Sequence, residues 1–359
     1  MTRYPKAFLP QSSLKPEGRK KIASMAHKVV DLHCDSVFSL MEGKDLREAV
    51  KGVHVDLPRL RAGGLALQVF AAYVPPETEN AFGYAMERLD AIDAFTASDE
   101  RLAPVETAAE LREALAGERT GVMAAVENGL AIENSLVKLE KLRRLKVRIL
   151  TLVHSRHLPW VASCTGTGAF CDDPGRGLSD FGEQVVDAMN DLGIIPDVSH
   201  ASEAAFWDVI KRSGKPPIAS HSCAYSLCAA ARNLKDDQLK AIADSGGVVG
   251  VNFFSAFLYE PFRLAFEKEE KNGNKDSDVS VKVPQSIIAD HIDYMVNVAG
   301  EDCIALGSDF DGIPSAPQGV TGSDFYPVLE AELRSRGYPE KRIEKIFNGN
   351  FLRLLEAWE

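Results

Sequence analysis

The segment IIPDVSHASEAAFWDVIKRSGKPPIASH (194–221) joins an apolar run, a helical pattern and a second apolar run. The two runs end at His200 and His221 and are mostly apolar without strict alternation. Such runs, joined by a helix, are typical of parallel strands that are buried on both faces. The segment therefore predicts a strand–helix–strand unit with a histidine at the end of each strand.

The same pattern continues along the rest of the chain. Apolar runs alternate with helical patterns, and most of the runs end in a histidine or a carboxylate. The predicted strands cover 28–34, 65–73, 121–127, 147–154, 194–200, 217–221, 247–253 and 303–309. Eight strands that are each followed by a helix favour a closed barrel over an open sheet. We therefore predict an α/β fold, a (β/α)8 TIM barrel that forms one domain over residues 1–359. A short N-terminal arm precedes it, and a charged, solvated insertion (266–282) follows the seventh strand.

The composition excludes several classes of partner. The formal net charge is −11, which argues against nucleic acid because a phosphate backbone needs a basic surface. No apolar stretch is long enough to span a bilayer, and the N-terminal segment has no apolar core of a signal peptide. We therefore expect a cytoplasmic protein without membrane contact. Cys164 and Cys171 flank a loop and are close enough in sequence to pair, although a cytoplasmic chain would keep them reduced.

His33 and Asp35 end the first predicted strand and are two positions apart. Their side chains project to the same side of the strand, so together they can bind one divalent cation. A histidine that is hydrogen-bonded to a carboxylate in a polar core explains the pair equally well. Glu127 ends the third strand after an apolar run and needs a cation nearby. Either Glu127 bridges two metal ions, or it forms a buried salt bridge with an arginine.

The histidines at 200 and 221 end consecutive strands. Neighbouring strands lie about 4.8 Å apart, so two terminal imidazoles can share one metal ion. A single histidine would more often be structural, whereas two at matching strand ends favour metal binding.

Two carboxylates lie in GSDFDG (307–312), at the end of the eighth strand. We favour Asp309 as a base or metal ligand because it follows the strand directly, and interpret Asp311 as a turn residue. Arg232 follows the small residues that come after the His221 strand. It is a candidate for binding an anionic group, against the alternative of a solvated surface arginine.

These stretches resemble the membrane (renal) dipeptidase family of the amidohydrolase superfamily. The similarity runs from DLHCD near residue 31 to the C-terminal helix. It includes AVENG, LTLVHSRHLPW, LSDFGEQVVDAMNDLGIIPDVSH, SHSCAYSLCAAARN, GVVGVNFF and GSDFDG. Two histidines separated by 21 residues (221 − 200), with SHSCAYS followed by RN, form a strong signal by themselves.

The resemblance implies a metallo-dependent hydrolase barrel with two Zn²⁺ ions per chain. His33 and Asp35 would bind one zinc ion. His200 and His221 would bind the other, with Glu127 as the bridge between the two ions.

Further roles are implied by the same resemblance. His154 and Arg232 would bind the substrate, His154 would also assist catalysis, and Asp309 would be the catalytic acid/base. The implied reaction is the hydrolysis of dipeptides, including L-Xaa-D-Xaa, by a binuclear zinc metallopeptidase. The sequence leaves the oligomeric state open, with a homodimer among the alternatives.

Three alternatives remain beside a dipeptidase. The same binuclear mechanism would serve N-acyl amino acids or another small amide or ester. Barrel metallohydrolases that act on phosphotriesters, lactones or nucleobases usually carry His-x-His on the first strand and often a carboxylated lysine on the fourth. Here the first strand has His-Cys-Asp and the fourth, RILTLVH, has no lysine. A non-catalytic scaffold would lack Asp309 or a metal ligand, and all are present.

Overall fold

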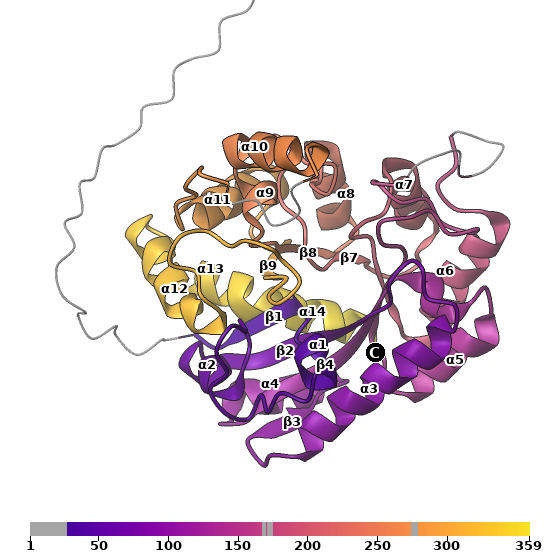
Figure 1. Cartoon of the computed structure of the whole chain (residues 1–359), viewed down its shortest axis with the longest axis horizontal. Helices are drawn as coiled ribbons and strands as arrows, with labels where there is room; N and C mark the ends of the chain where they lie inside the picture. Colours follow the sequence, from indigo (N-terminus) through magenta and orange to yellow (C-terminus); the bar gives the residue numbers. More distant parts are fainter. Residues whose placement is uncertain (1–26, 167–169, 171–174, 274–278) are drawn as a thin grey trace, which may run out of the picture.

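The computed structural model describes residues 27–166, 170, 175–273 and 279–359 (Figure 1). The predicted N-terminal arm, Cys171 and the middle of the predicted charged insertion therefore lie outside the described residues.

Eight parallel strands form a closed barrel, which confirms the predicted (β/α)8 fold. The sheet runs in the order β2-β1-β9-β8-β7-β6-β5-β4, and pairing between β2 and β4 closes it. The strands are β1 (Val29–Cys34), β2 (Leu65–Tyr73), β4 (Thr120–Glu127), β5 (Ile149–Thr151), β6 (Ile195–Asp197), β7 (Ile218–Ala219), β8 (Val248–Val251) and β9 (Ile304–Leu306).

Several strands end earlier than the apolar runs predicted. The run 194–200 forms strand only as far as Asp197. The Val198 N–H still bonds to the Ile218 carbonyl of β7, but the N–H groups that follow bind side chains instead of a neighbouring strand. The N–H groups of Ser199 and Ser220 both donate to the Asp197 carboxylate, each at 2.9 Å. A ninth strand, β3 (Leu102–Pro104), was not predicted, since three residues are too short to show a pattern. It pairs with the start of β4 and takes no part in closing the barrel.

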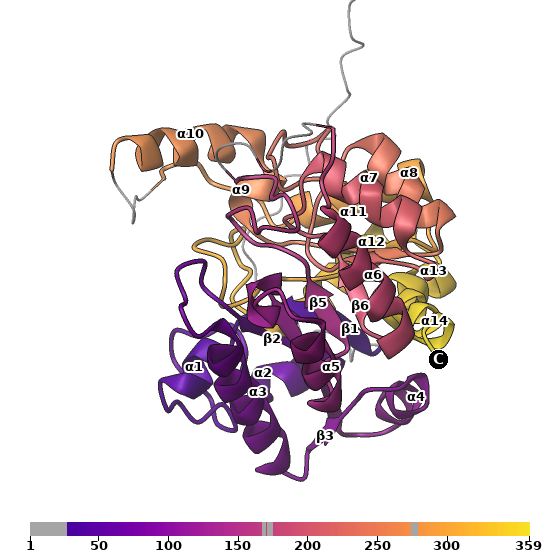
Figure 2. The same cartoon turned by 90° about the vertical axis from the view of Figure 1, so that its right-hand side faces the viewer.

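Helices surround the barrel (Figures 1 and 2). The helices are α1 (Val37–Met41), α2 (Leu57–Ala62), α3 (Ala81–Ala97), α4 (Ala108–Ala116), α5 (Leu136–Arg144), α6 (Asp180–Leu192), α7 (Glu203–Arg212), α8 (Asp236–Asp244), α9 (Ser255–Leu258), α10 (Glu260–Lys271), α11 (Ile287–Ala299), α12 (Tyr326–Ser335), α13 (Glu340–Glu344) and α14 (Asn350–Ala357). Several begin at caps that the sequence shows: the Ser179 and Ser202 hydroxyls accept N–H bonds from the first turns of α6 and α7. Within the described residues, none of these helices has both the length and the apolarity to cross a membrane.

The predicted charged insertion begins as helix. Its first residues belong to α10, which projects from the body of the protein in Figure 2. Phe262 and Phe266 of this helix pack toward the barrel, and the Phe266 ring lies 5.5 Å from that of Phe254. The helix is therefore anchored through its aromatic residues beside the loop that follows β8.

His291 of α11 fixes two loops that follow barrel strands. The side chain is fully buried. Its Nδ1 accepts the N–H of Ala224, after β7, at 3.2 Å, and its Nε2 donates to the Leu258 carbonyl, after β8, at 2.9 Å. Burial lowers the pKa of His291 to about 4. The imidazole is thus a neutral structural group in the folded protein.

This buried histidine predicts a loss of stability in acid. Between about pH 6.5, the ordinary pKa of histidine, and about pH 4, the pKa in the folded protein, His291 is protonated in the unfolded chain but neutral in the folded protein. Stability contributed by this group is therefore complete above pH 6.5 and falls by up to about 3 kcal/mol as the pH drops to 4. Urea unfolding of metal-free wild type and His291→Gln at several pH values measures it. The free energy of unfolding should depend less steeply on pH in the variant, and equal slopes would contradict the prediction.

Candidate functional site

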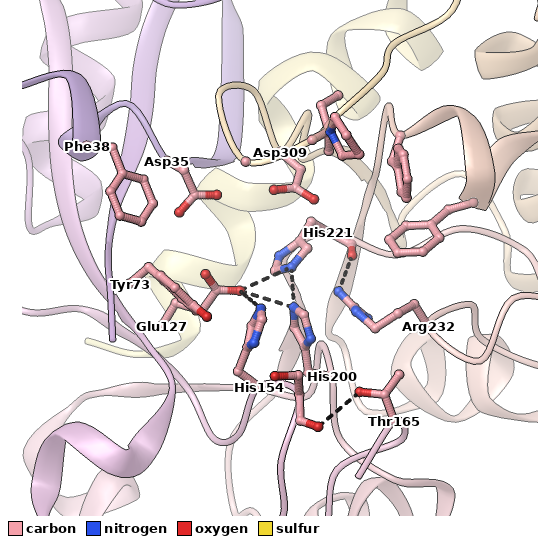
Figure 3. A pocket seen from close by; sticks show the side chains of 16 residues that line it. Asp35, Phe38, Tyr73, Glu127, His154, Thr165, His200, His221, Arg232 and Asp309 are labelled. Atoms are coloured by element: carbon pink, nitrogen blue, oxygen red, sulfur yellow. Dashed lines mark hydrogen bonds and ion pairs between the residues drawn. The ribbon is translucent and has the colours of Figure 1, made fainter. Parts of the chain in front are cut away.

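A pocket of about 370 Å³ opens at the carboxyl ends of the barrel strands (Figure 3). Seven of the eight predicted site residues line it, and His33 lies beneath with 2% of its surface exposed. The lining residues are Asp35, Phe38, Tyr73, Glu127, His154, Ser155, Thr165, His200, His221, Arg232, Phe254, Phe257, Asp309, Gly312, Ile313 and Pro314. The fold thus gathers residues from the ends of all eight barrel strands and their loops around one cavity.

Glu127 lies at the centre of this group. Its Oε1 atom is 3.1 Å from His200 Nε2 and 3.5 Å from His221 Nε2, and these two nitrogens are 3.1 Å apart. His154 Nε2 is 3.9 Å from the same oxygen. The other carboxylate oxygen, Oε2, is 3.7 Å from His33 Nε2. One carboxylate therefore faces two groups of side chains, the first around Oε1 and the second around Oε2.

The second group contains His33, Asp35 and Asp309. His33 Nε2 is 3.5 Å from Asp35 Oδ2 and 4.0 Å from Asp309 Oδ1. Within the described part of the chain, His33 Nε2 and Asp35 Oδ1 are buried and have no hydrogen-bond partner. Leaving such atoms unpaired is costly, so the carboxylate oxygen calls for a cation or a proton donor, and the imidazole nitrogen calls for a metal ion or, when protonated, for an acceptor. Imidazole nitrogens and carboxylate oxygens are ligands that zinc accepts, and the two groups therefore fit divalent metal ions.

Burial and mutual charge perturb the pKa values of these side chains. Burial lowers the pKa values of His200 and His221 well below the ordinary value, so both are neutral and able to bind a metal. Burial also acts to lower the pKa of His33, but the charges of Glu127 and Asp35 raise it to about 10. Burial raises the pKa of Glu127 well above its usual range, against the opposing charge of His33. The carboxylates thus need nearby positive charge to stay ionised.

The backbone is held in special conformations at two of these positions. His200 and Asp309 have φ values of 67° and 62°, in the left-handed region that non-glycine residues rarely adopt. Next to them, a Cβ atom on Gly312 would lie 2.0 Å from Asp35 Oδ2 and 2.7 Å from Asp309 Oδ1. Glycine at this position therefore lets the loop after β9 close over the two carboxylates.

The two carboxylates of GSDFDG occupy different environments. Asp309 faces the pocket, and its Oδ2 accepts a hydrogen bond from Asn252 Nδ2 at 2.8 Å. Asp311 instead accepts bonds from the Ser36 hydroxyl and the His54 N–H, both at 2.6 Å, and joins the loops after β1 and β9. Burial raises the pKa of Asp309 to about 7, whereas bonds to His54 and Ser36 outweigh burial and lower that of Asp311. Asp309 is therefore a titratable group at the pocket, whereas Asp311 is a structural carboxylate beside it.

Arg232 is a buried cation at the pocket wall. Only 6% of its surface is exposed, and its guanidinium donates to the His221 carbonyl at 3.1 Å. Its guanidinium carbon lies 5.6 Å from the centre of the Phe257 ring. In the described ranges its hydrogen bonds go to the His221 carbonyl and the Ser222 hydroxyl and to no carboxylate, and its buried Nε has no acceptor. A buried cation without an anion is unfavourable, so the site is suited to an anionic ligand group.

Several residues of the site were not predicted from the sequence. Tyr73 ends β2 and its ring lies edge-on to His154, with centroids 4.7 Å apart. Asn252 is fully buried, and its amide oxygen accepts the Phe254 N–H at 2.6 Å, which leaves its NH2 group to face Asp309. Both residues lie at the end of a buried strand, and this position was the signal in the sequence that could have identified them. A tyrosine or an asparagine carries no charge, however, and does not stand out among ordinary strand-end residues.

A closed parallel barrel with imidazoles and carboxylates gathered at the carboxyl ends of its strands defines the class of barrel metallohydrolases. Residues 19–359 match the family Membrane dipeptidase (Peptidase family M19), and the chain belongs to this family.

Individual relatives agree with this assignment. Dipeptidase 3 of Mus musculus is 32% identical over 321 residues, which are 89% of this chain and 60% of the mouse protein. The structure of the dipeptidase AC, a metallopeptidase of family M19, is similar with a TM-score of 0.80 and 31% identity, over 93% of this chain and 99% of that one. A metallopeptidase from Rhodobacter sphaeroides, liganded with a phosphinate mimic of the dipeptide L-Ala-D-Ala, gives a TM-score of 0.80 at 30% identity, with the same coverage. The chain spans less than two thirds of the length of the mouse protein.

Proposed function

We propose that this protein is a zinc-dependent dipeptidase that hydrolyses the amide bond of dipeptides, including L-Xaa-D-Xaa. The observation that carries the proposal is the buried Arg232, without a carboxylate partner among the described residues, beside two groups of metal-binding side chains. A dipeptide has a carboxylate for the arginine and an amide bond within reach of a metal centre. The dipeptide mimic bound by the Rhodobacter sphaeroides relative supports the substrate class and the D-configured second residue.

In this proposal, two zinc ions would be bound by five side chains. His33 and Asp35 would hold one ion, and His200 and His221 would hold the other. Glu127 faces both groups and would contribute to both sites. When bound, zinc supplies Lewis acidity toward the scissile carbonyl and lowers the pKa of a water molecule to about 7.

Asp309 holds and transfers the proton. The Asn252 amide occupies its Oδ2, so the proton is carried at Oδ1, the atom that faces His33. With a pKa that burial raises to about 7, Asp309 can take a proton from the nucleophile and pass it to the leaving amine near neutral pH. The carbonyl end of Asn252 is fixed by the Phe254 N–H, so the amide holds the carboxylate in one orientation.

His154 stabilises the negative charge that develops on the carbonyl oxygen. Burial, followed by the charge of Arg232, lowers its pKa to about 4, so the ring is neutral. A neutral imidazole donates one N–H without bringing a second charge into the cavity. An aimed donor of this kind favours the transition state over the ground state.

The same pocket favours a second candidate substrate class. Among the described lining residues, the carboxylates are Asp35, Glu127 and Asp309, and each already has a proposed role. No other carboxylate in that lining is left to bind the ammonium group of a dipeptide, so N-acyl amino acids fit as well. A panel of L-Xaa-D-Xaa dipeptides, L-Xaa-L-Xaa dipeptides and N-acyl amino acids, assayed with zinc restored, tests the proposal. If the protein hydrolyses none of these substrates, the proposal is rejected.

The arginine predicts that substrates need a free terminal carboxylate. Amidated dipeptides and tripeptides should be poor substrates of the wild type, because neither presents that charge at the guanidinium. Loss of one charge-assisted contact should lower kcat/KM by roughly ten- to a hundred-fold. Rates on one dipeptide and on its C-terminal amide, for the wild type and Arg232→Ala, measure this.

The variant supplies the control for this prediction. Arg232→Ala should lose activity on the free acid and keep little preference between acid and amide, since the contact is already absent. Equal wild-type rates on both substrates would contradict the carboxylate contact. They would also remove the main reason to prefer a dipeptidase over a general amidohydrolase.

A further inference from the structure

A buried carboxylate outside the pocket joins the ends of three strands. Asp197 ends β6, is fully buried and does not line the pocket. Its Oδ1 accepts the backbone N–H groups of Ser199 and Ser220, each at 2.9 Å. Its Oδ2 accepts the hydroxyls of Thr151 and Ser220, each at 2.6 Å. Four donors thus converge on one side chain, which connects the ends of β5, β6 and β7.

The Ser220 hydroxyl extends this arrangement to a predicted metal ligand. Its Oγ lies 2.7 Å from His221 Nδ1 as well as 2.6 Å from Asp197. A hydroxyl has one proton to donate, and here it goes to the carboxylate. His221 Nδ1 must therefore be the donor to Ser220, which places the proton of this neutral imidazole on Nδ1.

The opposite side of the ring agrees with this assignment. His221 Nε2 faces two groups, Glu127 Oε1 at 3.5 Å and His200 Nε2 at 3.1 Å. With its proton on Nδ1, His221 presents a lone pair toward them, as metal binding requires. Histidines that bind metals commonly donate their other N–H to a neighbouring group, which fixes the tautomer and the ring orientation.

We propose that Asp197 is a positioning residue that acts through Ser220 to hold His221 as the Nδ1–H tautomer and so keeps Nε2 free for metal. The consequence for metal binding rests on the proposed function, whereas the tautomer does not. Asp197 does not line the pocket, and the path by which it reaches the Nδ1 atom of His221 is the hydroxyl of Ser220.

Other histidines of the chain provide an internal reference. The Nδ1 atoms of His54, His157 and His291 each accept a backbone N–H, at 3.0, 2.9 and 3.2 Å. Those rings, when neutral, must carry the proton on Nε2. His221 is therefore expected to be the opposite tautomer from these three in the same protein.

The ¹⁵N chemical shifts of the histidine rings test the tautomer directly in metal-free protein. The His221 signals, assigned by their loss in His221→Gln, should show a protonated Nδ1 and an unprotonated Nε2, opposite to His291. An Nε2–H tautomer of His221 in the wild type would overturn the proposal. This readout needs neither substrate nor turnover, so its failure is distinguishable from a failure of the proposed dipeptidase activity.

Two substitutions at the carboxylate separate positioning from structural support. In Asp197→Asn, the backbone N–H groups retain the amide oxygen, so the NH2 group faces Ser220. The hydroxyl must then accept from the amide and donate to His221, which reverses the tautomer. Zinc affinity, measured by competition with a chelator, should fall roughly 10–100-fold. Thr151→Val removes a bond to the same carboxylate oxygen with little change in shape. It should lower the melting temperature but leave the tautomer and the zinc affinity unchanged.

Ser220→Ala supplies an independent variant if Asp197→Asn does not fold. Without the hydroxyl, the His221 tautomer is no longer fixed, and zinc affinity should again fall, whereas Ser220→Thr should restore it. Equal zinc affinities for Thr151→Val and Ser220→Ala would show a merely structural role and overturn the proposal.

Discussion

Asp309→Asn is expected to lower kcat by roughly 10²–10⁴-fold, the range typical for loss of a general acid/base. Asparagine keeps the shape of the side chain but cannot take up or release the proton. The Asn252 amide, which donates to Asp309 Oδ2 at 2.8 Å, can still bond to the amide oxygen of the variant. The fold and the metal content should therefore be preserved, and steady-state kinetics with elemental analysis of the same sample measures both.

The neighbouring carboxylate gives a matched control. Asp311→Asn alters a side chain that bonds to Ser36 and His54 away from the pocket lining. This substitution should lower the melting temperature but leave kcat close to the wild-type value. A variant Asp309→Asn with near-full activity, together with an inactive Asp311→Asn, would reverse the assignment within this loop.

Glu127→Gln is expected to release metal and with it nearly all activity. The purified wild type should hold close to two zinc equivalents per chain, because imidazoles and carboxylates form two groups that share this side chain. A glutamine is a weaker ligand without charge and cannot bridge two cations as a carboxylate does. The side chain is buried, with 3% of its surface exposed, so bulk water compensates little for the lost charge. Elemental analysis after zinc reconstitution measures the loss.

His154→Ala provides the comparison for metal content. His154 Nε2 is 3.9 Å from Glu127 Oε1, yet its proposed role is to bind substrate. This variant should keep its zinc and lose rate, so the two substitutions separate metal binding from catalysis. Wild-type protein that takes up no zinc on reconstitution would contradict the metal centre, and metal loss in His154→Ala equal to that in Glu127→Gln would contradict the bridging role.

The barrel could be predicted from the sequence because its signals are local. Apolar runs of strand length alternate with helical patterns, and parallel strands place their carboxyl ends at the same end of a barrel. His33, Glu127, His200 and His221 all follow such runs, so their meeting at one end of the barrel follows from the topology. Strand ends were less predictable: the run 147–154 forms strand only over Ile149–Thr151. The apolar pattern continues through residues 152–154, beyond the last residue of the strand.

Features that depend on contacts between distant segments could be found only in the tertiary structure. The sequence offered Asp309 and Asp311 as rivals, and their environments differ because Asn252 reaches one and His54 reaches the other. Arg232 could equally have been a solvated residue, and its burial with a carbonyl and a hydroxyl as partners, and no carboxylate in the described segments, is a property of the folded loop.

The amino-acid sequence by itself determined the barrel and the kinds of ligand at its strand ends, since strand periodicity and strand-end chemistry are properties of neighbouring residues. The tertiary structure decided which atom of each side chain faces which partner. The contacts of Asp197 with Thr151 and Ser220 span 46 and 23 residues, and no local pattern records them. Hydrogen-bond direction and burial arise only when the closed sheet brings such segments within bonding distance.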